Sequence, residues 1–249
     1  MRILQTYQFI TKALAEQDEP SKRYSPFIIL VGPSASGKDT LAEDLDPCGY
    51  KKILSYTTRP KRQGEALHPT HVHIKPETMN QMLLDGKLAA YSKFDKHEYA
   101  TAKEDFFTKD IAILDVKGLM SLELPRDMKR PIVVVRVNAS RKTRAQRMLE
   151  RGQTKREVRR RIRHDDYEFD ELRMKYIGMA LETVLPPHTL FSIVDIDTDS
   201  DTAPITNRYN NLVAVVGTLQ HYMRDYSSSI FVSLDKIACQ AALSPLDNV

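Results

Sequence analysis

The chain of 249 residues contains only two cysteines, and neither lies in a pattern that would build a site. Cys48 and Cys239 form no CxxC pair and no zinc-ligand spacing, which excludes a disulfide scaffold and a zinc ribbon. No apolar run approaches the roughly 18–20 residues that a membrane-spanning helix requires. The first 20 residues include polar residues throughout and lack a small-residue cleavage site, so they do not resemble a secretory signal. From these absences we expect a reducing, cytoplasmic setting and no membrane partner.

The overall composition is that of an ordinary globular protein, with 41% hydrophobic and 28% charged residues. The net charge is only +4, but the charges are unevenly distributed. Residues 126–163 contain fifteen Lys or Arg against three Asp or Glu. A segment this one-sided repels itself unless it meets an anion or is fully solvated. Because the other segments are balanced or acidic, we expect a compact, phosphate-bearing small molecule as the partner, and no nucleic acid.

From residue 26 onward, short β-rich apolar runs alternate with polar segments of helical length. The expected strands are 27–31, 52–56, 111–116, 132–137 and 192–196. The expected helices are 38–45, 141–151 and 155–180. Buried Ile, Val and Leu runs separated by helices predict an α/β fold with a mostly parallel sheet that is covered on both faces.

The chain divides into a main domain and two additions. Residues 1–25 show apolar residues at helical spacing and then a break at Pro20, which indicates an amphipathic helix and a linker. Residues 26–225 form the expected main domain, which ends in a further helix at 209–223. Residues 226–249 are a C-terminal tail whose sequence carries no interpretable signal.

The first apolar run leads directly into the pattern G-x-x-x-x-G-K at residues 32–38, and a helical segment follows. The glycines let the backbone wrap around an anion, while successive N–H groups and the helix N-terminus point at phosphate oxygens. The lysine adds a mobile positive charge for the β- and γ-phosphates. A strand before the loop and a helix after it are the context that a P-loop requires. We therefore predict a nucleoside triphosphate site, for ATP in the combined prediction below, formed by Gly32, Ser34, Ser36, Gly37, Lys38, Asp39 and Thr40.

The residue after the P-loop lysine departs from the common pattern. That residue is usually Ser or Thr, whose hydroxyl binds Mg²⁺, but here Asp39 stands there and Thr40 follows. A carboxylate is a good ligand for a hard cation, so Asp39 could bind Mg²⁺ directly or through water. Alternatively, Thr40 supplies the hydroxyl. The sequence leaves both possibilities open.

The block SYTTRPKRQGE at residues 55–65 makes the chain resemble a guanylate-kinase-like nucleoside monophosphate kinase. In that family, a strand ending in S-x-T-T-R-x-x-R-x-G-E follows the P-loop helix, and its serine and two arginines hold the acceptor phosphate. The resemblance implies this role for Ser55, Arg59 and Arg62. Two guanidinium groups that converge on one phosphate form bidentate, charge-assisted hydrogen bonds, so the chemistry agrees with the resemblance. The expected acceptor-binding region is a small β-rich insert at about residues 55–101.

Weaker similarities to the family extend over roughly residues 26–223. Tyr99 and Thr101 match a tyrosine and a hydroxyl residue that contact the acceptor. His71 stands where the family has a tyrosine that helps to bind the acceptor phosphate, and a histidine can also donate to a phosphate. Asp115 matches an acidic residue near the metal ion, and is a third candidate ligand for Mg²⁺.

Residues 141–170 resemble the mobile helical lid of the family, and local signals also predict two helices there. Ser140 is a good N-cap, Gly152 is a good stop, and Thr154 with Glu157 forms a capping box for the next helix. One apolar stripe is expected along that helix, formed by Val158, Ile162, Phe169, Leu172, Tyr176 and Met179. Lid arginines would neutralise the charge on the transferred phosphoryl group. The candidates for this catalytic role are Arg147, Arg151 and Arg161.

The residues that would read the base differ from those of the family. Members that select guanine carry a glutamate nine positions before the tyrosine that matches Tyr99, and this chain has Ala90 there. A second acidic residue, two positions after the one matching Asp115, has no counterpart in the shorter segment 116–118. Losing a charge-assisted partner costs on the order of 1.5–3 kcal/mol per bond, or roughly 10–100-fold in discrimination. We therefore expect relaxed or non-guanine base selectivity.

The combined prediction is ATP- and Mg²⁺-dependent phosphoryl transfer to a nucleoside or deoxynucleoside monophosphate by a monomer or homodimer. Virally encoded deoxynucleotide kinases fit this description by analogy. Three alternatives remain open. One is a ribose 1,5-bisphosphate phosphokinase, which also carries Gly-Lys-Asp in its P-loop but lacks the full T-T-R-x-x-R block. Another is a kinase acting on a nucleotide or modified base within DNA, which the basic lid suggests. The last is a catalytically inactive guanylate-kinase-like interaction module, against which the presence of Lys38, Arg59 and Arg62 counts.

Overall fold

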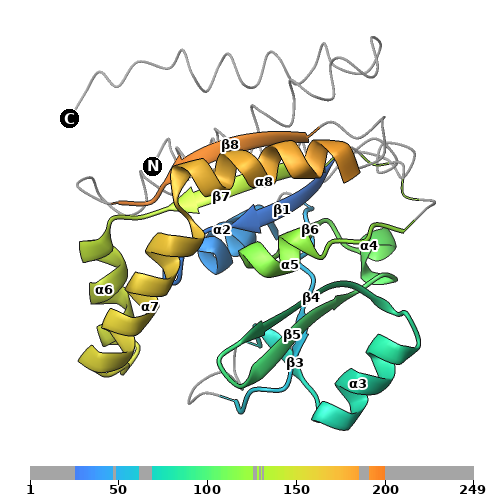
Figure 1. Ribbon diagram of the computed structural model, residues 1–249, viewed down its shortest axis with the longest axis horizontal. Helices are drawn as coiled ribbons and strands as arrows, with labels where there is room; N and C mark the ends of the chain where they lie inside the picture. Colours follow the sequence, from blue (N-terminus) through green and yellow to red (C-terminus); the bar gives the residue numbers. More distant parts are fainter. Residues whose placement is uncertain are drawn as a thin grey trace.

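The computed structural model describes residues 26–199, except for residues 47–48, 62–68, 126–127, 129, 131 and 185–190. The predicted N-terminal helix, the helix at 209–223 and the C-terminal tail lie outside the described residues, and so does Arg62. Figure 1 shows the described part as two sheets with their helices, one sheet above the other. In the part of the chain that the structure describes, no helix is long and apolar enough to cross a membrane.

The upper sheet in Figure 1 is four-stranded and parallel, in the order β6-β1-β7-β8. Its strands are β1 (Phe27–Val31), β6 (Ile111–Ile113), β7 (Ile132–Asn138) and β8 (Phe191–Asp197). Strand β1 pairs on both sides and all five of its residues are fully buried, which explains its continuous apolar sequence. The predicted α/β fold with a parallel sheet is confirmed.

Helices cover both faces of this sheet. Alternate residues of β1 point to opposite faces, so that Ile28 and Leu30 pack with helix α2 (Lys38–Leu45), while Phe27, Ile29 and Val31 pack on the other side. That other side is covered by α5 (Val116–Met120) and α8 (Glu171–Val184). The P-loop therefore lies at the carboxyl end of β1 and leads directly into the N-terminus of α2.

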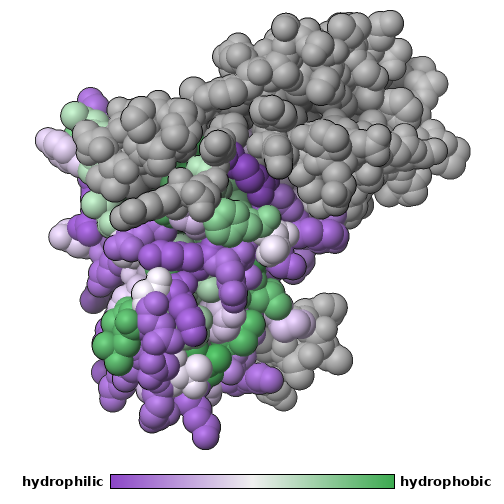
Figure 2. All heavy atoms as spheres, turned by 90° about the vertical axis from the view of Figure 1, so that its right-hand side faces the viewer, coloured by the Kyte–Doolittle hydropathy of each residue, from purple (hydrophilic) through white to green (hydrophobic). Residues whose placement is uncertain are grey.

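The smaller sheet has the order β3-β2-β5-β4 and corresponds to the expected β-rich insert. Its elements are β2 (Ser55–Thr57), β3 (His71–His73), α3 (Pro76–Leu84), β4 (Leu88–Phe94) and β5 (His97–Ala102). Helix α3 covers one face, where the fully buried Met79 packs against Leu88 and Ala100. Because side chains alternate along a strand, Tyr99 and Thr101 point to the opposite face from Ala100. The short helix α4 (Asp105–Thr108) then leads back to the parallel sheet at β6. Figure 2 shows a largely hydrophilic surface on the described part of one side, with hydrophobic side chains in small patches.

The region predicted to be a lid is a pair of helices, α6 (Arg141–Glu150) and α7 (Lys155–Glu168). The predicted caps are confirmed: the Ser140 hydroxyl accepts a hydrogen bond from the Thr143 N–H, and Thr154 forms a complete capping box with Glu157. Gly152 adopts φ +79° between the two helices, a conformation that favours glycine.

The prediction of one helix over residues 155–180 is wrong, because the chain forms two helices. Helix α7 ends at Glu168 and α8 begins at Glu171. The Asp170 carboxylate accepts hydrogen bonds from the N–H groups of Leu172 and Arg173, at 3.1 and 3.3 Å, and so caps a new helix. The break shifts the phase of the apolar face. Leu172, Tyr176 and Met179, predicted to continue the stripe, are 68%, 69% and 55% exposed, while Met174 and Ile177 pack in the core.

Candidate active site

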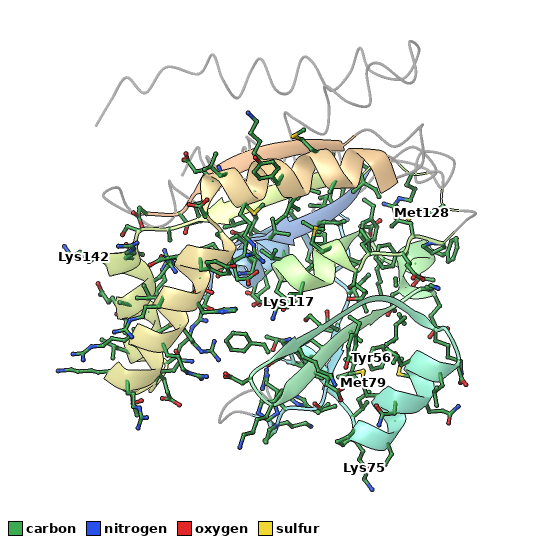
Figure 3. All side chains as sticks on the ribbon, viewed as in Figure 1. Tyr56, Lys75, Met79, Lys117, Met128 and Lys142 are labelled. Carbon is green, nitrogen blue, oxygen red and sulfur yellow. The ribbon has the colours of Figure 1, made fainter. Side chains whose placement is uncertain are left out.

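A cavity of about 250 Å³ lies between the P-loop, the smaller sheet and helix α7. Figure 3 shows Lys117, which lines it from α5, in the space between the two sheets, whereas Lys142 on α6 points outward. Most of the predicted site residues line this one cavity. They are Gly32, Ser34, Lys38, Asp39, Ser55, Arg59, His71, Tyr99, Thr101, Asp115 and Arg161.

The P-loop lysine is hydrogen-bonded to the backbone of its own loop. Lys38 Nζ donates hydrogen bonds to the carbonyl oxygens of Gly32 and Pro33, at 2.7 and 2.8 Å. A Cβ atom on Gly32 would lie 2.1 Å from the Val137 carbonyl oxygen, so the close approach of the loop to β7 requires glycine. Ser36 is fully buried, and its Oγ has no hydrogen-bond partner among the described residues. A polar atom of this kind beside a turn of backbone N–H groups fits a loop that binds phosphate oxygens.

Burial changes the proton affinity of the P-loop lysine. It lowers the pKa of Lys38 from 10.5 to about 8, although the nearby carboxylates of Asp39 and Asp165 favour the charged form. The positive charge of Arg151 lowers this pKa further. The Lys38 ammonium therefore lies in surroundings where an additional anion would stabilise it.

Two of the three candidate metal ligands line the cavity. Asp39 forms an ion pair with Lys52, 3.0 Å from Oδ1 to Nζ, and Asp115 Oδ1 accepts a hydrogen bond from the Gly118 N–H at 2.7 Å. Thr40 is not among the lining residues. No group of three His, Cys, Asp or Glu side chains suited to a metal ion occurs within the described ranges. Because Mg²⁺ usually takes one or two carboxylates together with substrate phosphates, Asp39 and Asp115 fit such a site.

The predicted acceptor residues gather around Arg59, which is only 6% exposed. Its Nη2 lies 3.3 Å from His71 Nδ1, and the His71 and Tyr99 rings form an edge-to-face pair with centroids 5.8 Å apart. The Thr70 hydroxyl oxygen also lies 2.8 Å from His71 Nδ1. Ser55 Oγ and Thr101 Oγ1 lie 3.5 Å apart on the same wall. Hydroxyl, imidazole and guanidinium groups thus gather in one corner of the cavity.

The wall formed by β4 and β5 presents no carboxylate to the cavity. Its lining residues are Ala90, Tyr91, Ser92, Lys93, Phe94, Tyr99, Ala100 and Thr101. Ala90 is 2% exposed and pairs with Thr101 across the hairpin. The nearby Glu98 is not a lining residue. Its carboxylate accepts a hydrogen bond from Tyr91 Oη at 2.5 Å and pairs with Lys93 Nζ at 3.1 Å.

The structure separates the three predicted lid arginines. Arg161 lines the cavity, and its guanidinium carbon lies 5.5 Å from the centre of the Phe94 ring. Arg147 instead braces the loop from outside the cavity, with Nη1 donating to the Ala35 carbonyl at 3.1 Å and Nη2 to the Thr198 carbonyl at 2.9 Å. Arg151 is exposed and does not line the cavity.

Sequence reasoning missed charged residues in and around this site, among them Lys52 and Asp165. Lys52, which pairs with Asp39, lies in an expected strand, and no motif marks it. Asp165 lies on α7 and accepts hydrogen bonds from Ser34 of the P-loop, 131 positions away along the chain. No local pattern in the sequence could reveal a contact across that separation.

A P-loop after an inner strand of a parallel sheet, with a second small sheet and an arginine-rich helical pair beside it, defines a nucleotide-binding fold. The family model for guanylate kinase matches residues 24–176, which is more than half of the chain. The chain therefore belongs to the guanylate kinase family.

Individual relatives are distant. The guanylate kinase of Blochmanniella floridana is 34% identical over 87 residues, which cover 33% of this chain and 41% of that protein. The guanylate kinase of Syntrophotalea carbinolica is 30% identical over 84 residues, covering 32% and 40%. The chain thus matches about two fifths of the length of these curated relatives.

The solved structures that resemble the chain are also remote in sequence. A guanylate kinase from Anaplasma phagocytophilum has a TM-score of 0.49 and 13% identity, covering 88% of this chain and 95% of that one. A gluconokinase from Sinorhizobium meliloti 1021 has a TM-score of 0.31 and 17% identity, covering 80% and 98%. The family assignment therefore depends on the family model.

Proposed function

We propose that the protein transfers the γ-phosphoryl group of ATP to a nucleoside or deoxynucleoside monophosphate, giving ADP and the diphosphate. The observation that carries this proposal is that Lys38 of the P-loop and the buried Arg59 of the acceptor wall line one cavity. Two cationic centres on facing walls suit a reaction that brings two phosphate-bearing molecules together.

In the proposed mechanism, the loop at residues 32–40 binds the triphosphate, and Ser55, Arg59 and His71 bind the acceptor phosphate. An acceptor oxygen attacks the γ-phosphorus in line, while Lys38 and Arg161 stabilise the negative charge that spreads over the transferred group. A general base is not required, because the second pKa of a phosphate monoester is about 6. Asp39 and Asp115 would hold Mg²⁺, which when bound neutralises charge on the β- and γ-phosphates.

We further propose that the enzyme does not select guanine. Guanine presents N1–H and N2–H₂ donors, for which family members that select it supply carboxylates. The described lining of β4 and β5 contains none, Ala90 stands at the first of these positions, and Glu98 is engaged by Tyr91 and Lys93. A wall without a carboxylate penalises guanine relative to the family and tolerates pyrimidines better.

A panel of ribo- and deoxynucleoside monophosphates, with ribose 1,5-bisphosphate added, tests this proposal. Each compound is assayed with Mg·ATP for ADP release, and Lys38→Ala serves as the blank because it should abolish turnover. We expect kcat/KM for GMP or dGMP to exceed that for the best other nucleotide by no more than about tenfold, a difference of about 1.4 kcal/mol. A thousandfold guanine preference would refute relaxed selectivity. Turnover of ribose 1,5-bisphosphate alone, or of no free acceptor, would refute the monophosphate kinase itself.

A further inference from the structure

A carboxylate from the lid helix lies against the P-loop. Asp165 Oδ2 accepts a hydrogen bond from the Ser34 N–H at 2.9 Å, and Oδ1 accepts from the Ser34 hydroxyl at 3.3 Å. Asp165 is 5% exposed and lines the same cavity as Lys38. Backbone N–H groups of this loop are the groups that bind phosphate oxygens in P-loop proteins. Asp165 therefore supplies an anion at a position where the loop is built to receive one.

Asp165 is held there from behind by a buried arginine. Arg144 is 4% exposed, and its Nη1 lies 3.3 Å from Asp165 Oδ2, while its Nη2 lies 3.1 Å from Asp166 Oδ1. Arg144 Nε also donates to the Ala139 carbonyl at 3.1 Å, which fixes the guanidinium at the end of β7. Burial nevertheless raises the pKa of the Asp165 carboxyl, although Ser34, Arg144 and Lys38 favour its charged form.

We propose that Asp165 is an internal competitor of the triphosphate, occupying the Ser34 N–H until a nucleotide displaces it. The inference rests on the proposed binding of ATP at residues 32–40. The single hydrogen of the Ser34 amide cannot be shared fully by two anions, and like charges a few ångströms apart in a largely buried site repel strongly. A phosphate group that takes this amide must therefore move the Asp165 carboxylate away.

The helix that carries Asp165 also reaches the acceptor side. Arg160 forms a bidentate ion pair with Asp95 at the tip of the β4–β5 hairpin, and His164 packs on Phe94 with ring centroids 5.0 Å apart. Displacement of Asp165 therefore acts on a helix that touches both walls of the cavity. In this arrangement, binding of the triphosphate breaks the contact between α7 and the P-loop. The contacts of α7 with the β4–β5 hairpin are then no longer constrained by the P-loop.

Isothermal titration of Asp165→Asn with Mg·ATP, and separately with inorganic tripolyphosphate, tests the competition. Asp166→Asn is the matched control. Asp166 shares Arg144 with Asp165 and its substitution removes the same charge, but among the described residues its ion pairs are with Arg144 and Arg141 of α6. We expect D165N to bind both ligands about tenfold more tightly than wild type, as when one charge-assisted hydrogen bond no longer competes. D166N should stay within about twofold of wild type. Equal or weaker binding by D165N than by D166N would overturn the inference.

A measurement on the wild-type chain covers the case in which D165N does not fold. Tripolyphosphate should speed amide hydrogen exchange at residues 163–168, because the Asp165 carboxylate leaves Ser34. Slower exchange there would indicate a lid that simply closes on its ligand, and would overturn the inference. The two proposals can fail separately. If D165N binds ATP more tightly than the wild type but no monophosphate is phosphorylated, the proposed function is wrong, while the competition between Asp165 and the triphosphate is supported.

Discussion

At the scale of single residues, the charge on Lys38 decides how the loop responds to pH. Its pKa of about 8 means that the ammonium form dominates at pH 7 and declines above pH 8. Bound phosphates stabilise the ammonium form, so nucleotide binding above pH 8 must take up a proton. The proton uptake reduces the apparent affinity as pH rises.

The first prediction concerns this pH dependence. Between pH 8 and 9.5, the Kd of the wild type for Mg·ATP should increase, approaching tenfold per pH unit at its steepest, since each unit of pKa corresponds to about 1.36 kcal/mol. Lys38→Arg keeps a permanent charge, so its Kd, even if weaker, should change by less than about twofold over that range. Titration calorimetry in two buffers of different ionisation enthalpy measures the proton uptake directly. A flat profile for the wild type would contradict the shifted pKa.

Residue types also explain how much of the site could be predicted from the sequence. The P-loop and the residues Ser55, Arg59 and Thr101 lie in motifs with fixed spacing, and the structure brings them to one cavity. The contact between Arg59 and His71 depends on the parallel pairing of β2 with β3. Such a contact is set by the sheet, and spacing along the chain carries no information about it.

At the scale of elements, caps with short-range partners could be predicted, and the break in the long helix could not. Ser140, Gly152 and the Thr154 capping box each act within three or four residues, so the sequence alone specifies them. Apolar residues continue at helical spacing through Phe169 and Leu172, with no glycine or proline to mark an end. The Asp170 cap takes effect because Met174 and Ile177 pack in the core, and this packing is tertiary.

Asp115 has a structural position and a candidate role in metal binding. Its carboxylate caps helix α5 and also lines the cavity. Asn is as good an N-cap as Asp, whereas Ala is not. Asp115→Ala should therefore lower the free energy of unfolding by about 1 kcal/mol, and Asp115→Asn by only a few tenths. If the carboxylate also binds Mg²⁺, both variants should lose at least about tenfold in kcat. Urea unfolding measures the capping role, and steady-state kinetics measure the role in Mg²⁺ binding. A kcat of D115N equal to that of the wild type would show that Asp115 caps α5 but does not bind the metal ion.

At the scale of the whole molecule, α7 connects parts that belong to different sheets. It contacts the P-loop after the parallel sheet through Asp165, and the hairpin of the smaller sheet through the Arg160–Asp95 pair. These contacts join segments 65 to 131 residues apart in the sequence, so they could not be predicted from local patterns. In the described structure, the second helix of the predicted lid therefore contacts both walls of the cavity.

The Arg160–Asp95 pair should matter more for the position of the lid than for the stability of the fold. Arg160 is 57% exposed at its side chain, and exposed ion pairs contribute about 0–1 kcal/mol. Arg160→Ala should therefore lower the free energy of unfolding by less than about 1 kcal/mol, while amide exchange in residues 158–164 becomes at least about threefold faster.

The control is Arg156→Ala, which should leave this exchange unchanged. Arg156 is an exposed arginine of the same helix, and it has no ion pair among the described residues. Because the two partners act through one contact, Asp95→Asn should speed exchange as R160A does, and the double variant should add nothing further. Additive effects of R160A and D95N would show that the pair does not hold the lid against the hairpin.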